Sequence, residues 1–173
     1  MELGPVDRIT ADAVGEPGMR VFYLQARHLD ELVTIVVEKE QIQLLAASVL
    51  ELLSGVDVET GLGPPEELMG LEEPVEARWR AGRLSIGYEE TRDLFLLEIE
   101  EFLPELEEDD PARLLQGEPD EVRLWATREQ MLALSRHGTE VAERGRPTCQ
   151  YCGNPIDPRG HACPAMNGHH KEA

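Results

Sequence analysis

The stretch VTIVVEKEQIQLL, residues 33–45, changes from a strand pattern to a helix pattern within a few residues. From Ile42 onward, apolar residues recur at the i, i+3, i+7, i+10 and i+11 spacing of one face of an amphipathic helix. A second stretch, VRLWATREQMLAL at residues 122–134, aligns with the first without a gap at an offset of 89 residues. The sequence therefore predicts two strand–helix units, with helices near 39–54 and 128–144.

The apolar faces of both helices should pack in the core. Thr127 followed by Gln130 fits a capping box, in which each residue satisfies a backbone N–H of the other at the start of the helix. The helix residues that we expect to be buried are Ile42, Leu45, Leu134 and Val141.

Strand patterns lie upstream of each helix. The gaps between the strands are short, which favours antiparallel pairing. We therefore expect an α+β fold, an antiparallel sheet with two packed helices, over a body at residues 1–145, with the Gly-, Pro- and Glu-rich segment 57–74 as a surface crossover. The expected strands are 6–14, 20–28 and 32–38, then 75–81, 83–89, 93–102 and 121–127.

Two explanations fit the similarity between the halves. One is an internal duplication, with half-repeats at residues 1–56 and 75–145. The other is coincidence, because any strand that enters an amphipathic helix shows this pattern.

All three cysteines lie in the stretch CQYCGNPIDPRGHAC, residues 149–163. Cys149 and Cys152 form a C-x2-C knuckle, and Cys163 follows a turn that brings the chain back. Three thiolates and one imidazole suit tetrahedral Zn²⁺, so we predict a small zinc-ribbon-like tail at residues 146–173. A common ribbon would place its fourth ligand at Met166, a poor zinc ligand. His161 is therefore the first choice, with His169 or His170 as substitutes.

A reduced metal-free thiol cluster or a redox pair is the alternative to zinc. Three cysteines do not suit a disulfide framework, which normally uses an even number. A site with four protein ligands is structural, whereas an open position could activate water. Zinc-dependent deaminases need an H-x-E motif, and neither HLDE (28–31) nor HGTE (137–140) has that spacing. We identify no catalytic residue and no organic cofactor site, and favour a protein that is not an enzyme.

The charge of the chain constrains its partners. Net charge is −19, which disfavours nucleic acid and anionic membranes. The run 98–110 holds eight carboxylates and no base; it could bind a basic partner or a hard cation, but a solvated edge and loop is the usual case. The tail carries a local net charge of +3 over residues 144–171.

The sequence has no apolar stretch long enough to span a membrane and no signal-peptide pattern, so we expect a cytoplasmic protein.

Two motifs carry a resemblance to a known family. GEPGMRVFYLQAR (15–27) and RPTCQYCGNPIDPRGHACPAMNG (146–168) resemble domain-of-unknown-function family 3090, a bacterial family found largely in actinobacteria. The resemblance spans nearly the whole chain, including the VEKEQ helix entry. It implies no activity, since none is established for the family. It does imply that His161 rather than His169 is the ligand, because the family tail has a histidine before its last cysteine.

Three functions from different classes remain open. The first is a binding or adaptor module with a protein partner, which presents its zinc-stapled tail. The second is an enzyme with an unrecognised site in the α+β body, and the third is nucleic-acid binding through the basic tail. The absence of a catalytic motif favours the first, and the overall charge disfavours the third. The sequence leaves the oligomeric state open.

Overall fold

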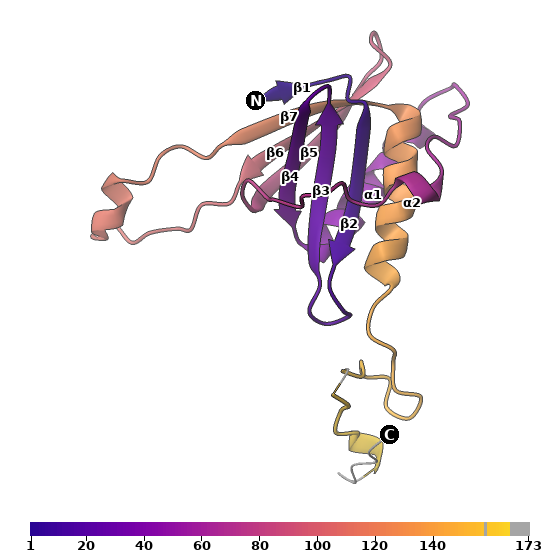
Figure 1. The fold of residues 1–173 in the computed structure, drawn as a ribbon, viewed down its shortest axis with the longest axis vertical. Coiled ribbons are helices and arrows are strands. Elements are labelled where there is room, and N and C mark those ends of the chain that lie inside the picture. Colours follow the sequence, from indigo (N-terminus) through magenta and orange to yellow (C-terminus); the bar gives the residue numbers. More distant parts are fainter. Residues whose placement is uncertain (158, 167–173) are drawn as a thin grey trace.

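The computed structural model describes residues 1–157 and 159–166. Figure 1 shows an α+β body with strands and two long helices, from which a tail without long elements extends. The α+β class is therefore confirmed. In chain order the elements are β1 (Glu2–Leu3), β2 (Arg8–Val14), β3 (Val21–His28), β4 (Glu31–Val37), α1 (Lys39–Ser54), η1 (Glu66–Leu68), β5 (Ala81–Glu89), β6 (Leu94–Glu101), η2 (Pro111–Leu114), β7 (Glu121–Thr127), α2 (Arg128–Glu143) and η3 (Pro164–Met166).

The strands form two sheets, with orders β2-β3-β4 and β1-β7-β6-β5. Within each half, consecutive strands pair antiparallel, as predicted: β2 with β3, β3 with β4, β5 with β6 and β6 with β7. The short β1 adds in parallel to β7. The division arises because the chain leaves the first sheet after β4, forms α1, and builds a second antiparallel set from β5, β6 and β7.

The expected strand at 75–81 differs in the structure. Residues 78–80 run parallel to β4, where Arg78 N–H donates to Thr34 O at 2.9 Å and Val36 N–H donates to Trp79 O at 3.0 Å. The chain then continues directly into β5 at Ala81. Gly82, which separates the two sequence patterns, is a β-bulge inside β5 and does not end a strand.

The predicted helices and their buried faces are confirmed. Thr127 caps α2 as expected: its Oγ1 accepts from Gln130 N–H at 3.1 Å, and its own N–H donates to Gln130 Oε1 at 2.9 Å. The helices pack against each other, and Gly138 allows the approach, because a Cβ there would lie 2.9 Å from Ile42 Cγ2. The exposed fractions of the predicted core residues are 1% for Ile42, 4% for Leu45, 0% for Leu134 and 3% for Val141.

The two halves have the same order of elements. Each is a three-stranded antiparallel set followed by a helix, β2-β3-β4-α1 and β5-β6-β7-α2. The helices are exchanged, so that α2 packs beside β2 and α1 lies beside β5. Each half also adds a short parallel segment to the last strand of the other, β1 to β7 and residues 78–80 to β4. This order supports the duplication, which stays a prediction that superposition of the halves would test.

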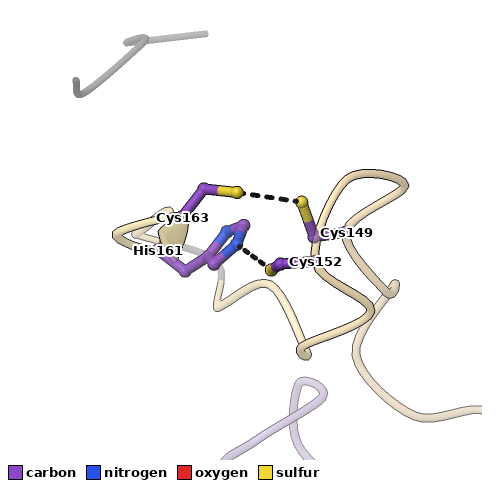
Figure 2. A group of neighbouring side chains, drawn as sticks. All are labelled: Cys149, Cys152, His161 and Cys163. Carbon is purple, nitrogen blue, oxygen red and sulfur yellow. Dashed lines mark hydrogen bonds between the residues drawn. The ribbon is translucent and has the colours of Figure 1, made fainter. Parts of the chain in front are cut away.

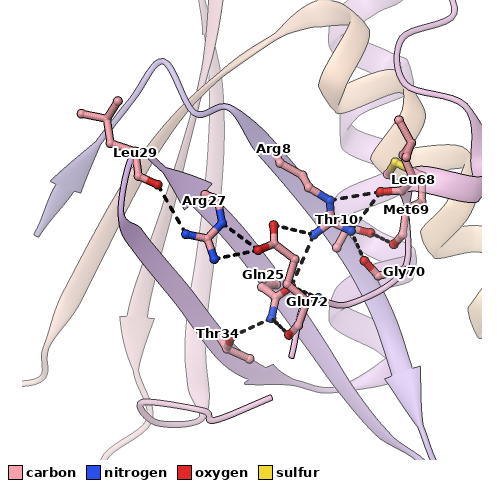
Figure 3. Close-up of polar contacts among 10 residues, drawn as sticks. All are labelled: Arg8, Thr10, Gln25, Arg27, Leu29, Thr34, Leu68, Met69, Gly70 and Glu72. Atoms are coloured by element: carbon pink, nitrogen blue, oxygen red, sulfur yellow. Dashed lines mark hydrogen bonds and ion pairs between the residues drawn. The ribbon is translucent and has the colours of Figure 1, made fainter. Parts of the chain in front are cut away.

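The segment 57–74 is more than a surface crossover, because part of it covers one face of the first sheet. We call residues 66–72 the strap (Figure 3). Gln25, fully buried, donates from Nε2 to Thr34 Oγ1 and to Glu72 O, both at 3.0 Å, and accepts from Glu72 N–H at 2.7 Å. Met69, 1% exposed, accepts at its carbonyl from the Thr10 hydroxyl. The strap therefore satisfies polar side chains that the helices do not reach.

A buried histidine joins the strap to the body. His137 on α2 is 5% exposed; its Nδ1 contacts the Glu66 carboxylate, and its Nε2 lies 3.6 Å from Asp12 Oδ2. Burial opposes the charged imidazolium, but the contacts with these two carboxylates outweigh it, so the pKa of His137 is raised above its ordinary value of 6.5.

This arrangement predicts a pH dependence of stability. Because the folded pKa exceeds the unfolded one, protonated His137 stabilises the fold fully below pH 6.5, and that stability is lost as the pH rises through the folded value. We expect the Tm to fall more steeply between about pH 6 and about pH 8 for the wild type than for His137→Gln. Thermal unfolding by circular dichroism measures both slopes. Equal slopes would contradict the assignment.

Candidate metal centre

The first two cysteines lie on a tight knuckle that follows α2. Cys149 N–H donates to Asn154 O, and Gly153 N–H donates back to Cys149 O, both at 2.8 Å. Gly153 has a φ of +73°, in the left-handed region that favours glycine. The knuckle therefore closes because a glycine follows the second cysteine, and this places Cys149 and Cys152 side by side.

A second turn brings the other two residues to the knuckle. Gly160 N–H donates to Asp157 O at 2.8 Å, and Gly160 has a φ of +86°. His161 follows at once, and Cys163 precedes the short η3 turn. The turn that the sequence predicts before Cys163 thus ends at Gly160, with Pro158 outside the described residues.

The four predicted side chains converge on one point (Figure 2). One ligand atom from each of Cys149, Cys152, His161 and Cys163 lies within 4.8 Å of the others. Cys149 Sγ is 3.8 Å from Cys163 Sγ, and Cys152 Sγ is 3.4 Å from His161 Nε2. Cys149 and Cys163 are each 7% exposed, and the other two are half-buried. Together the four can hold a metal ion.

The backbone of the knuckle favours a thiolate at the first cysteine. The N–H groups of Tyr151 and Cys152 point at Cys149 and lower the pKa of its thiol to about 7. Burial raises the pKa of the Cys163 thiol. Thiolates are the metal-binding form of cysteine, and a cation would offset the cost of burying charge at Cys163.

One contact that the sequence did not indicate lies between the tail and the body. The side chain of Arg146 pairs with Asp157 inside the tail. The same side chain lies against the β2–β3 turn, since a Cβ on Gly18 would be 3.1 Å from Arg146 Cδ. No local pattern in the sequence indicates this contact, because Gly18 and Arg146 are distant along the chain.

Other residues considered from the sequence lie elsewhere. His137 is on α2 between two carboxylates, and His28 contacts the Pro5 carbonyl through Nδ1. His169 and His170 lie outside the described residues. Within residues 1–157 and 159–166, the Cys/His group is the only group of three or more Cys, His, Asp or Glu side chains that are close enough together to hold a metal ion.

The acidic run 98–110 begins in β6 and continues into the β6–β7 connection. Figure 1 shows this connection extending away from the sheets as an arm. The arm ends in η2, and Leu114 and Leu115 near its tip are about nine-tenths exposed. The carboxylates of the acidic run thus belong partly to β6 and partly to an extended loop.

No helix in the described part of the chain is long and apolar enough to cross a bilayer.

Comparison with known proteins places the chain in a family. The model of the family described as "Protein of unknown function (DUF3090)" matches residues 1–163, which include the body and the four converging side chains. The comparison with curated proteins and the comparison with solved structures each gave no match. The resemblance of the two terminal motifs is therefore confirmed over nearly the full length, and the chain belongs to the DUF3090 family of proteins of unknown function.

Proposed function

We propose that the protein binds one structural Zn²⁺ through Cys149, Cys152, His161 and Cys163. The observation that carries this proposal is the spacing of the ligand atoms. Tetrahedral zinc with bonds of about 2.3 Å to sulfur and about 2.0–2.1 Å to nitrogen needs S–S distances of about 3.8 Å and S–N distances of about 3.5 Å. The observed 3.8 Å and 3.4 Å agree with both. Three soft thiolates and one imidazole also select zinc over hard cations.

The metal would act as a structural staple. Four protein ligands fill a tetrahedral site and leave no position for water or substrate. In the tail, the described residues 146–166 form few contacts of their own apart from turns, so zinc binding would supply the free energy that orders them.

We further propose that the stapled tail is a binding surface for a partner protein, in the cytoplasm. Tyr151 lies between the two knuckle cysteines and is 64% exposed. A rigid aromatic side chain on a fixed turn is a common anchor in protein interfaces. Nucleic-acid binding is disfavoured because Arg144 and Arg146 already pair with Glu140 and Asp157. An enzyme site in the body stays the alternative, and no described contact favours it.

Affinity capture from the native host tests this role. The intact protein, Tyr151→Ala and Cys149→Ser serve as baits, with Phe102→Ala as the matched control, since Phe102 is an aromatic 53% exposed on the body. We expect a protein retained by the intact chain and by Phe102→Ala, and lost with Tyr151→Ala and Cys149→Ser. A captured set that is the same for all four baits would argue against a tail-borne interface.

The fourth ligand can be tested separately. We expect His161→Ala to weaken zinc affinity by at least about 10-fold, since the loss of outer-shell partners alone costs 10–100-fold. His169→Ala is the matched control, and its affinity should stay near that of the wild type. Competition with a chromogenic zinc chelator gives both values. A larger loss in His169→Ala would transfer the fourth position to that residue.

A further inference from the structure

One edge of the second sheet is unpaired. β5 is the last strand in the order β1-β7-β6-β5, and it pairs only with β6. Gln41 on α1 donates from Nε2 to the carbonyl of Gly82 at 3.1 Å, at the start of the strand. Beyond that point, no described residue other than those of β6 forms a backbone hydrogen bond with residues 83–89. A free edge of this length is a template for another strand.

The first strand of the first half is packed more tightly than β5. There β2 is the edge strand, and α2 packs against it closely, with Gly138 beside Ala11. Residues 9–11 of β2 are buried, with Ala11 beside α2 and Thr10 beneath the strap, where its hydroxyl donates to the Met69 carbonyl. In contrast, every residue from Leu84 to Glu89 in β5 stays half-exposed, although α1 takes the corresponding place.

A groove of about 250 Å³ separates α1 from β5. Its apolar walls include Leu44, which is 69% exposed, with Leu84 and Ile86 opposite. Leu44 is thus exposed next to the half-buried Leu84 and Ile86 at an unpaired strand edge. Apolar side chains exposed in this way are typical of an edge to which a further strand adds.

Two copies of β5 can pair with each other in antiparallel orientation. If the pairing is centred on Ile86, Arg83 of each copy lies opposite Glu89 of the other, which gives two such charge pairs. Leu84 then lies opposite Tyr88, and Ile86 opposite Ile86, so that like faces meet. Opposite charges and apolar side chains in directly facing positions are the pairs that stabilise antiparallel strands.

We propose that the protein forms a two-fold homodimer through its β5 edges, in this register, with the two second sheets joined into one. The net charge of −19 per chain opposes association at low salt. At about 0.15 M salt the screening length is about 8 Å, which leaves the direct Arg83–Glu89 contacts as the main charge interaction between the copies.

A charge-swap series tests the interface and its register together. Arg83→Glu places Glu against Glu89 in both pairs, and Glu89→Arg places Arg against Arg83. Each single variant should raise the dimer dissociation constant about 10-fold or more, and the double variant R83E/E89R should return it toward the wild-type value. Arg144→Glu is the control for Arg83→Glu, because it makes the same charge change at an exposed residue directly after α2.

The readout is sedimentation equilibrium of the full chain, with thermal unfolding of each variant as a check of folding. The check is needed because both swapped residues also have charged neighbours within their own copy. Arg83 lies opposite Glu100 of β6, and Glu89 Oε2 is 3.7 Å from Arg92 Nε. A dimer that both single swaps weaken and the double swap restores supports the proposal. A monomer at all concentrations, a dimer that the swaps leave unchanged, or single swaps that the double does not rescue would each overturn it.

Discussion

Cys149→Ser is expected to abolish metal binding and to release the tail while the body stays folded. Cys149 supplies one of three thiolates, and its backbone closes the knuckle through Asn154 and Gly153. Metal content should fall from about one ion per chain to a small fraction of that. Residues 146–166 should lose their slow amide exchange, because the described contacts of the tail with the body are few and centre on Arg146. The free energy of unfolding of the body should change by less than about 0.5 kcal/mol.

Metal analysis, amide hydrogen exchange and denaturant unfolding on the same variant measure the three effects. Tyr151→Ala is the matched control, since it changes the neighbouring knuckle residue and removes no ligand atom. A Cys149→Ser protein that keeps its metal would remove this residue from the site. One whose body unfolds would mean that the tail and the body are a single cooperative unit.

Gln25→Leu is expected to lower the free energy of unfolding by about 2–4 kcal/mol, because it leaves buried polar groups without partners. Gln25 is fully buried and bonds Thr34 and both backbone groups of Glu72. Leucine fills nearly the same space, so the loss reports hydrogen bonds and not a cavity. The strap should also exchange its amide hydrogens faster at Glu72.

Arg27→Met is the control for the strap. Arg27 pairs with the same Glu72, but the Arg27 and Glu72 side chains are each 31% exposed. An ion pair open to water contributes little, so its loss should cost far less than that of Gln25. Equal losses in the two variants would mean that charge, and not the buried amide, holds the strap.

The parts of the structure that depend on local sequence could be predicted. The Glu-Gln pairs at 40–41 and 129–130 and the capping pair Thr127–Gln130 mark the helix starts to within a few residues. Both helices begin where these signals place them. The Cys/His cluster could be predicted for the same reason, because its four side chains lie within fifteen residues that contain two glycine turns. Ligand chemistry and turn chemistry are properties of short segments.

The parts that depend on distant pairing could not be predicted. Residues 78–80 alternate like an antiparallel strand, yet they join β4 in parallel, and Gly82 forms a bulge where the pattern is interrupted. Nothing in the composition of residues 66–72 indicates that Glu72 would meet Gln25, which lies 47 residues earlier. Alternation specifies which face of a strand is apolar, but it does not specify which strand lies beside it.

Elemental analysis of the purified protein is the sharpest test of the proposed zinc site. The protein is prepared under reducing conditions without added metal, and its zinc is compared with the chain concentration. We expect about one zinc per chain, released when the thiols are titrated with a mercurial reagent. Absence of zinc from protein that also fails to bind added Zn²⁺ would contradict it.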